Sequence, residues 1–189
     1  MGPYENTGRL LWWLERIARG GKVVAPGNPD RSIQLIDARD IAAFGLDQLE
    51  AGTAGRYLVT GTIGASTFGE LLEQCAKVTG SDAEMVWMDE SFLLEKKVAV
   101  WTGLPIWAVD QPVMAGTWLA SSRKALAAGL RCRPLAETVR DTWEWLQTRG
   151  PAIGPYKQGT TPLGIEAEKE QWLLDDWGEP QGFDIMPSR

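Results

Sequence analysis

Histidine is absent from the 189 residues of this chain, and cysteine occurs only twice. Without histidine the chain can build neither a Ser-His-Asp nor a Cys-His catalytic site, and it lacks the commonest protein ligand of zinc. Cys75 and Cys132 are far apart in the sequence, which indicates neither a disulfide framework nor a metal site. Cys75 falls on the apolar face of a predicted helix, where we expect it to pack. The sequence therefore predicts no metal site.

Long apolar runs and a surplus of positive charge are also lacking. No uninterrupted apolar stretch is long enough to span a bilayer, and no basic segment leads into an apolar run at the N-terminus. The formal net charge is −6, whereas nonspecific nucleic-acid binding needs a concentrated basic surface. We therefore expect a cytoplasmic protein with neither a membrane nor a nucleic-acid partner.

An extended run that leads directly into a helix organises the chain. Ile33 and Leu35 alternate with Ser32 and Gln34, which is the pattern of a half-buried strand. Asp37 then offers a carboxylate to the free amides of a helix over 38–50, and Asp40 adds negative charge to its first turn. We interpret both aspartates as helix-capping residues.

The sequence predicts a helix near the start of the chain that is rich in apolar residues and contains two adjacent tryptophans. Its apolar residues recur at helical spacing over 10–17, with Asn6 or Thr7 able to cap its beginning and Gly20–Gly21 ending it. Core packing is the favoured interpretation of this stripe, and a partner surface or a substrate wall is the alternative.

The remaining patterns complete an α/β chain. We expect strands over 22–25, 56–60 and 84–88, and helices after Thr67, Asp89, Ser121 or Ser122, and Pro134. Thr67 and Glu70 have the spacing of a capping box, which explains the glycine-containing loop before them without a bound phosphate. The expected organisation is a sheet edge and lobe over 1–149, a linker over 150–164, a helix over 165–177 and a loose tail over 178–189.

Several segments, in this order, resemble the C-terminal portion of the extended short-chain dehydrogenases/reductases, the NAD(P)-dependent epimerase/dehydratase family. The resemblance covers roughly residues 2–147. It rests on Gly2-Pro3-Tyr4-Glu5-Asn6-Thr7-Gly8-Arg9, Gly20-Gly21-Lys22-Val23-Val24-Ala25-Pro26-Gly27, Arg31 through Ala42, Gly55-Arg56-Tyr57-Leu58-Val59-Thr60-Gly61 and Thr67-Phe68-Gly69-Glu70-Leu71-Leu72.

The machinery of hydride transfer in that family is absent from the sequence. The family's cofactor turn resembles a Rossmann fold, in which glycines let backbone amides approach a pyrophosphate, and no such glycine spacing occurs here. Tyr-x-x-x-Lys, in which the lysine lowers the tyrosine pKa, is absent as well, because Tyr4, Tyr57 and Tyr156 are followed at that spacing by glycine or threonine. We therefore expect no catalytic residue and no tightly bound cofactor in this chain, although the resemblance implies NAD(P) for the complete enzyme.

The resemblance implies a role in substrate recognition. Arg31 resembles an arginine that contacts substrate phosphate in sugar-nucleotide members of the family, and a surface arginine is the alternative. Gln34 can bond a polar ligand or face solvent. Trp101 and Trp107 lie in the region that closes over substrate in the family, where they form a pocket wall or simply pack. The candidate substrate-binding residues are Tyr4, Asn6, Arg9, Arg31, Gln34, Trp101 and Trp107.

Two hypotheses follow from the sequence. In the first, the chain is the C-terminal, substrate-binding portion of a Rossmann-type oxidoreductase of this family, inactive without a missing N-terminal half that holds the cofactor. In the second, it is a stand-alone small-molecule-binding or protein-interaction module. The surplus of ten tryptophans motivates this hypothesis, which predicts a homodimer or heterodimer that buries the 10–17 stripe.

Overall fold

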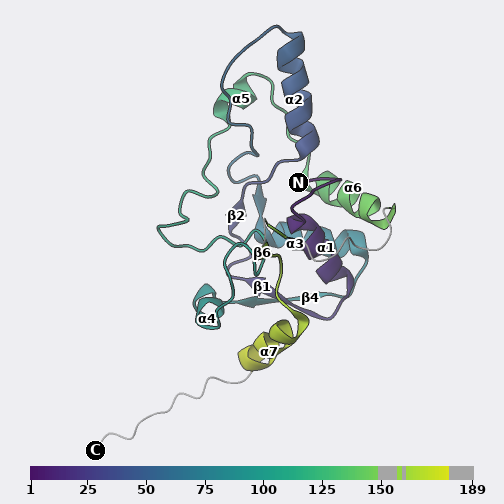
Figure 1. Cartoon of the computed structure of the whole chain (residues 1–189), viewed down its shortest axis with the longest axis vertical. Coiled ribbons are helices and arrows are strands. Elements are labelled where there is room, and N and C mark those ends of the chain that lie inside the picture. Colours follow the sequence, from purple (N-terminus) through teal and green to yellow (C-terminus); the bar gives the residue numbers. More distant parts are fainter. Residues whose placement is uncertain (149–156, 159–160, 179–189) are drawn as a thin grey trace, which may run out of the picture.

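The computed structural model describes residues 1–148, 157–158 and 161–178, and has an α/β fold (Figure 1). Its helices are α1 (Arg9–Ala18), α2 (Ala38–Glu50), α3 (Phe68–Thr79), α4 (Glu90–Glu95), α5 (Arg123–Ala127), α6 (Leu135–Thr148) and α7 (Ala167–Gly178). Its strands are β1 (Lys22–Pro26), β2 (Ser32–Ile33), β3 (Ser66–Thr67), β4 (Glu84–Met88), β5 (Lys157–Gln158) and β6 (Thr161–Pro162).

The main core lies where α1, α3 and α6 pack together against the β1–β4 sheet. The stripe on α1 is buried within the chain, which confirms the core interpretation and leaves this stripe unable to serve as a partner surface. The buried indole of Trp13 has a hydrogen-bond partner within the core, because its Nε1 donates to the Pro105 carbonyl at 2.8 Å. The buried stripe comprises Leu10, Leu11, Trp12, Trp13, Leu14 and Ile17.

The start of α1 is capped differently from the prediction. Gly8 occupies the N-cap position in a left-handed conformation, and no side chain there accepts a helix amide. Instead, the carboxylate of Glu5 accepts hydrogen bonds from the amides of Arg9 and Leu10 at 3.2 and 3.4 Å. Thr7, a predicted cap, donates its hydroxyl to the same carboxylate. The Glu5 side chain, and not the residue next to the helix, thus satisfies the free amides at the start of α1.

The β1–β4 pair is parallel, with Lys22 opposite Glu84 and Pro26 opposite Met88. One buried ion pair covers the outer edge of β1. Arg16 on α1 lies 2.5 Å from Glu170 on α7 and also donates to the Lys22 carbonyl, while the other Glu170 oxygen accepts from the Val24 amide. The C-terminal helix is thereby attached to the sheet edge.

The organising stretch forms largely as predicted. Asp37 caps α2 by accepting from the Arg39 amide, and α2 has the predicted bounds. Only Ser32 and Ile33 of the predicted strand pair with another strand, antiparallel to β3. The capping box of Thr67 at the start of α3 is confirmed, with both reciprocal hydrogen bonds present.

A smaller unit projects from this body at the top of Figure 1. It consists of α2, residues 51–65 and α5, and has its own cluster around Phe44, Ala125 and Leu130. The predicted strand over 56–60 is not part of any sheet among the described residues. We call this part of the chain the projecting unit.

Other predicted termini differ in detail. Asp89 and Ser122 precede α4 and α5 as expected, but neither side chain accepts a capping hydrogen bond. Most of the predicted linker, at 150–156 and 159–160, and the predicted tail beyond residue 178 lie outside the described residues. Among the helices described, none is both long and apolar enough to cross a membrane.

Candidate functional site

Five of the seven predicted site residues line a single cavity of about 430 Å³. They come from three separate parts of the chain: Tyr4, Asn6 and Arg9 precede or begin α1, Gln34 follows β2, and Trp101 lies in the irregular segment after α4. We call it the aromatic cavity. Segments far apart in the sequence therefore converge on one hollow lined by rings, amides and a guanidinium group.

The wall of the aromatic cavity combines two neighbouring tryptophan rings, tilted relative to each other, with a cation. The Arg9 guanidinium carbon lies 5.2 Å from the centre of the Trp101 ring, within the range of a cation–π interaction. The Trp101 ring in turn lies 5.6 Å from the Trp118 ring at an interplanar angle of 31°. This arrangement suits a ligand that carries a flat or ring-shaped group and a negative charge.

Trp118 is a wall residue that the sequence analysis missed. Its indole Nε1 is buried and has no hydrogen-bond partner among the described residues. A buried donor without a partner costs about 1–3 kcal/mol of free energy. A ligand whose acceptor atom bonded this donor would remove that cost. The signal in the sequence is weak, because Trp118 lies in a segment without helical or strand periodicity.

Backbone conformation is unusual at two wall residues. Tyr4 has a φ of 65° and Trp101 a φ of 69°, both in the left-handed region that side-chain-bearing residues rarely adopt. The Trp101 amide donates to the Trp107 carbonyl at 2.9 Å, which helps to hold this conformation. Tyr4 remains 80% exposed, with its ring 5.0 Å from that of Trp145. Such conformations occur frequently at binding sites, where surrounding contacts fix them.

Gln34 is buried instead of facing solvent, and its amide group joins two loops. Its Nε2 donates to the carbonyls of Gly61 and Ala120, and its Oε1 accepts from the Ala120 amide. Both amide hydrogens are therefore used within the chain. In the aromatic cavity Gln34 contributes mainly by holding the segment that follows Trp118.

Arg31 and Trp107 do not line the aromatic cavity. Both instead contact Glu90: the Arg31 guanidinium lies 3.1 Å from its carboxylate, and the Trp107 indole donates to it at 3.0 Å. Arg31 also donates to the Ala108 carbonyl and lines a separate cavity of about 250 Å³. Trp107 is buried in the main core. Trp118 borders both cavities, so the two hollows share one wall.

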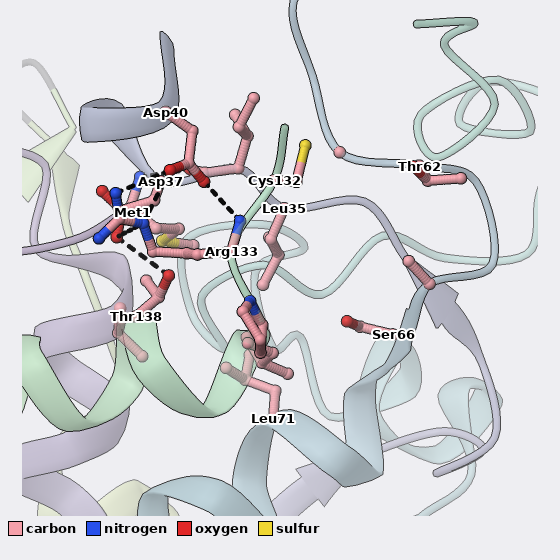
Figure 2. A pocket seen from close by; sticks show the side chains of 16 residues that line it. Met1, Leu35, Asp37, Asp40, Thr62, Ser66, Leu71, Cys132, Arg133 and Thr138 are labelled. Carbon is pink, nitrogen blue, oxygen red and sulfur yellow. Dashed lines mark hydrogen bonds and ion pairs between the residues drawn. The ribbon is translucent and has the colours of Figure 1, made fainter. Parts of the chain in front are cut away.

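A third cavity, of about 270 Å³, lies beside the start of α2 (Figure 2). Figure 2 shows Asp37, Asp40, Arg133 and Thr138 gathered on one side of it, with Ser66 and Leu71 across the hollow. Arg133 lies 2.8 Å from Asp40, and Thr138 donates its hydroxyl to Asp37. The charged groups here are thus paired with one another, and they connect α2 to the start of α6.

The electrostatics of this network favour a structural role. Burial opposes ionisation of Asp37, but hydrogen bonds from Arg39 and Thr138 outweigh it and keep the pKa of this carboxyl below its ordinary value. Burial, with a smaller effect of nearby Asp40, raises the pKa of the Cys132 thiol at the rim. Cys132 is therefore a poor nucleophile at neutral pH. Among the described residues, no group of acidic or cysteine side chains could hold a metal ion.

The fold is similar to part of the fold of two longer solved structures. The chain is similar to the RMD from Pseudomonas aeruginosa, solved with NADPH, with a TM-score of 0.51 and 18% sequence identity over 79% of this chain and 45% of that one. It is also similar to a GDP-L-fucose synthetase from Naegleria fowleri bound to NADP, with a TM-score of 0.52 and 13% identity over 80% of this chain and 44% of that one. The chain thus spans less than half the length of these structures. No protein-family model matches it. No curated protein sequence matches it either.

The loop before α3 offers no free helix amides to the pyrophosphate of a dinucleotide. The glycine-containing loop over 61–66 leads into α3, but the first amides of that helix are engaged by the capping box, with the Glu70 amide donating to the Thr67 hydroxyl at 3.1 Å. A phosphate would have to displace these bonds. The aromatic cavity, in contrast, is lined by aromatic rings and by Trp118, whose buried indole donor has no hydrogen-bond partner among the described residues.

Proposed function

We propose that this chain is the substrate-binding portion of an NAD(P)-dependent oxidoreductase of the epimerase/dehydratase family, inactive alone. The aromatic cavity is its substrate site, and a separate polypeptide segment supplies the cofactor turn and the tyrosine–lysine pair. In this arrangement Arg9 binds a negatively charged group, Trp101 stacks on a ring, and Trp118 donates a hydrogen bond to an oxygen atom.

The convergence of five residues on the aromatic cavity is the observation that supports this proposal. Tyr4, Asn6, Arg9, Gln34 and Trp101 were selected from the sequence for the substrate role, and they line one hollow. The volume of about 430 Å³ is within the range of small-molecule sites. The fold shared with enzymes that hold NADPH or NADP supports the class of reaction.

A stand-alone small-molecule-binding module is the second candidate. It is favoured by the closure of the main core within this chain, since the α1 stripe is buried and α7 covers the outer edge of β1. In this case the aromatic cavity would bind a ligand without any chemistry following. The two candidates share the site and differ in the need for a cofactor-bearing partner.

Calorimetric titration with GDP-L-fucose tests the site, because one structural neighbour is a GDP-L-fucose synthetase. This probe carries rings and negative charge. We expect saturable binding that weakens about ten-fold or more in Trp101→Leu, since a stacked ring contributes about 1–2 kcal/mol. Trp172→Leu is the matched control, because Trp172 is an exposed tryptophan on α7. Equal loss in both variants would count against the aromatic cavity as the binding site.

A further inference from the structure

An extended segment in the projecting unit has no strand beside it. Residues 56–60 have the composition of a strand, and 56–59 alternate between exposed and half-buried positions. Within the described part of the chain, residues 57–60 make no backbone hydrogen bond, and none of their side chains makes one either. Four consecutive residues of a β-type segment thus present their amides and carbonyls unpaired.

The segment is nevertheless held in place along its length. The Tyr57 ring packs edge-on against Phe44 of α2 at 5.2 Å, and Val59 packs on the same cluster. At its ends, the Arg56 carbonyl accepts from the Lys124 side chain at 2.9 Å, and the Gly61 carbonyl accepts from Gln34 at 2.7 Å. Because these contacts fix the extended conformation in advance, a second strand could add to it at a low cost in chain entropy.

The projecting unit also exposes apolar side chains. Leu58 is 55% exposed, and α2 leaves Leu46 and Leu49 58% and 75% exposed. Only Phe44 and Asp40 of α2 are buried. Exposed leucines next to an unpaired extended segment are typical of a surface that packs against another part of a larger protein.

We propose that residues 56–60 are a docking strand, which pairs with the edge strand of a β-sheet in the cofactor-binding segment required by the proposed function. The occupant follows from two observations. The structural neighbours are more than twice as long as the matched region. Among the described residues the parallel sheet, β1–β4, has two strands, where a dinucleotide fold needs a larger parallel sheet. Main-chain hydrogen bonds give the affinity, and Leu58 and the leucines of α2 bury apolar surface.

Amide hydrogen exchange tests the docking strand. In the isolated chain we expect residues 57–59 to exchange within about ten-fold of an unstructured peptide, while β1 and α1 are protected. The probe is a fusion of the whole chain, through a flexible glycine–serine linker, to the part of the Pseudomonas aeruginosa RMD that lies outside the similarity. Tethering raises the effective concentration to about the millimolar range, so that weak pairing is measurable. Exchange at 57–59 is expected to slow at least about ten-fold in the fusion protein.

Two variants make the result specific. Leu58→Lys puts a charge at the proposed contact and is expected to remove most of the protection at 57–59. Val113→Lys is the matched control, because Val113 is 85% exposed and lies in a different loop, and it should leave the protection unchanged. NADPH binding shows that the cofactor-binding part of the fusion protein is folded, and unchanged exchange at 57–59 in that folded fusion would overturn the proposal.

Self-pairing is the competing outcome. Concentration-dependent protection of 57–59 in the isolated chain would mean that a second copy occupies the strand, and the proposal would be wrong. The proposed function fails separately, by loss of ligand binding in the aromatic cavity of the isolated chain, so the two failures can be told apart.

Discussion

The guanidinium group of Arg9 lies over the Trp101 ring, 5.2 Å from its centre, although 92 residues separate the two in sequence. This contact connects the start of α1 with the irregular segment after α4. It places a positive charge and an aromatic face on the same wall of the aromatic cavity. The pair therefore predicts how an anionic ligand with a ring would bind.

Replacing Arg9 by glutamine should weaken binding of GDP-L-fucose about ten-fold, because one charge-assisted contact contributes about 1.5 kcal/mol. The loss should be smaller at high salt, where the charge is screened. Arg19→Gln is the control, since Arg19 is exposed at the end of the same helix. Calorimetry at two salt concentrations measures both effects, and a salt-independent loss would argue against a charge contact.

Asp37→Ala should lower the free energy of unfolding by about 3 kcal/mol. The change removes a helix cap and the carboxylate that accepts from Thr138 and Arg39, and Arg39 keeps only its ion pair with Asp141. Asp47→Ala, an exposed position on the same helix, should change stability by less than about 0.5 kcal/mol. Urea unfolding followed by circular dichroism distinguishes the two variants, and similar losses in both would contradict the network in Figure 2.

Acid should selectively remove the contribution of this network. The pKa of Asp37 is lowered in the folded state, so the folded form binds fewer protons than the unfolded form near the ordinary carboxyl pKa of about 4. Its stabilising effect is thus fully present above that value and is lost as the pH falls through the lowered pKa. The difference in stability between the wild type and Asp37→Asn should therefore shrink below about pH 4. A difference that grows on acidification would contradict the sign of the shift.

Glu170→Gln should destabilise the chain by about 3 kcal/mol or more, because it leaves the Arg16 guanidinium buried without its anion. Glu168→Gln is the control on the exposed side of the same helix. Increased proteolysis of α7 in Glu170→Gln would show that this ion pair attaches the helix to β1. Equal cleavage in both variants would contradict that attachment.

Gly61→Ala should strongly destabilise the chain, because an added Cβ would lie 2.0 Å from the Leu35 carbonyl oxygen. We expect a loss of about 3 kcal/mol, since backbone must move. Gly45→Ala is the opposite case: apart from the backbone of α2 itself and the adjoining residues, nothing lies within 4 Å of the Cβ position, so the change should stabilise by about 1 kcal/mol. Thermal unfolding of both variants measures the contrast, and a lower melting temperature for Gly45→Ala would contradict an exposed, unpartnered helix face.

Local signals predicted the fold well where the cause was itself local. The Asp37 cap, the Thr67–Glu70 capping box and the strands around Val24 and Val86 all depend on neighbours in sequence, and all are present. The cap of α1 was wrong because Glu5 reaches past the adjacent Thr7. Residues 56–60 did not form a paired strand because a strand needs a partner, which no local pattern supplies.

The site was predicted in part for the same reason. Tyr4, Asn6 and Arg9 are close in sequence, and their meeting with Trp101 depends on how α1 packs. Trp118 was missed because its buried indole donor is visible only in three dimensions. The prediction placed Arg31 and Trp107 in the substrate site, but in the fold both contact the carboxylate of Glu90. No pattern in the sequence indicates these two contacts.

Side-by-side calorimetric titration of the isolated chain with GDP-L-fucose and NADPH tests the assignment of a substrate portion most directly. We predict saturable heat with GDP-L-fucose and no saturation with NADPH up to about 1 mM, which corresponds to less than about 4 kcal/mol of binding free energy. Saturation by NADPH in the micromolar range, or by neither ligand, would contradict a chain that binds the substrate and leaves the cofactor to another segment.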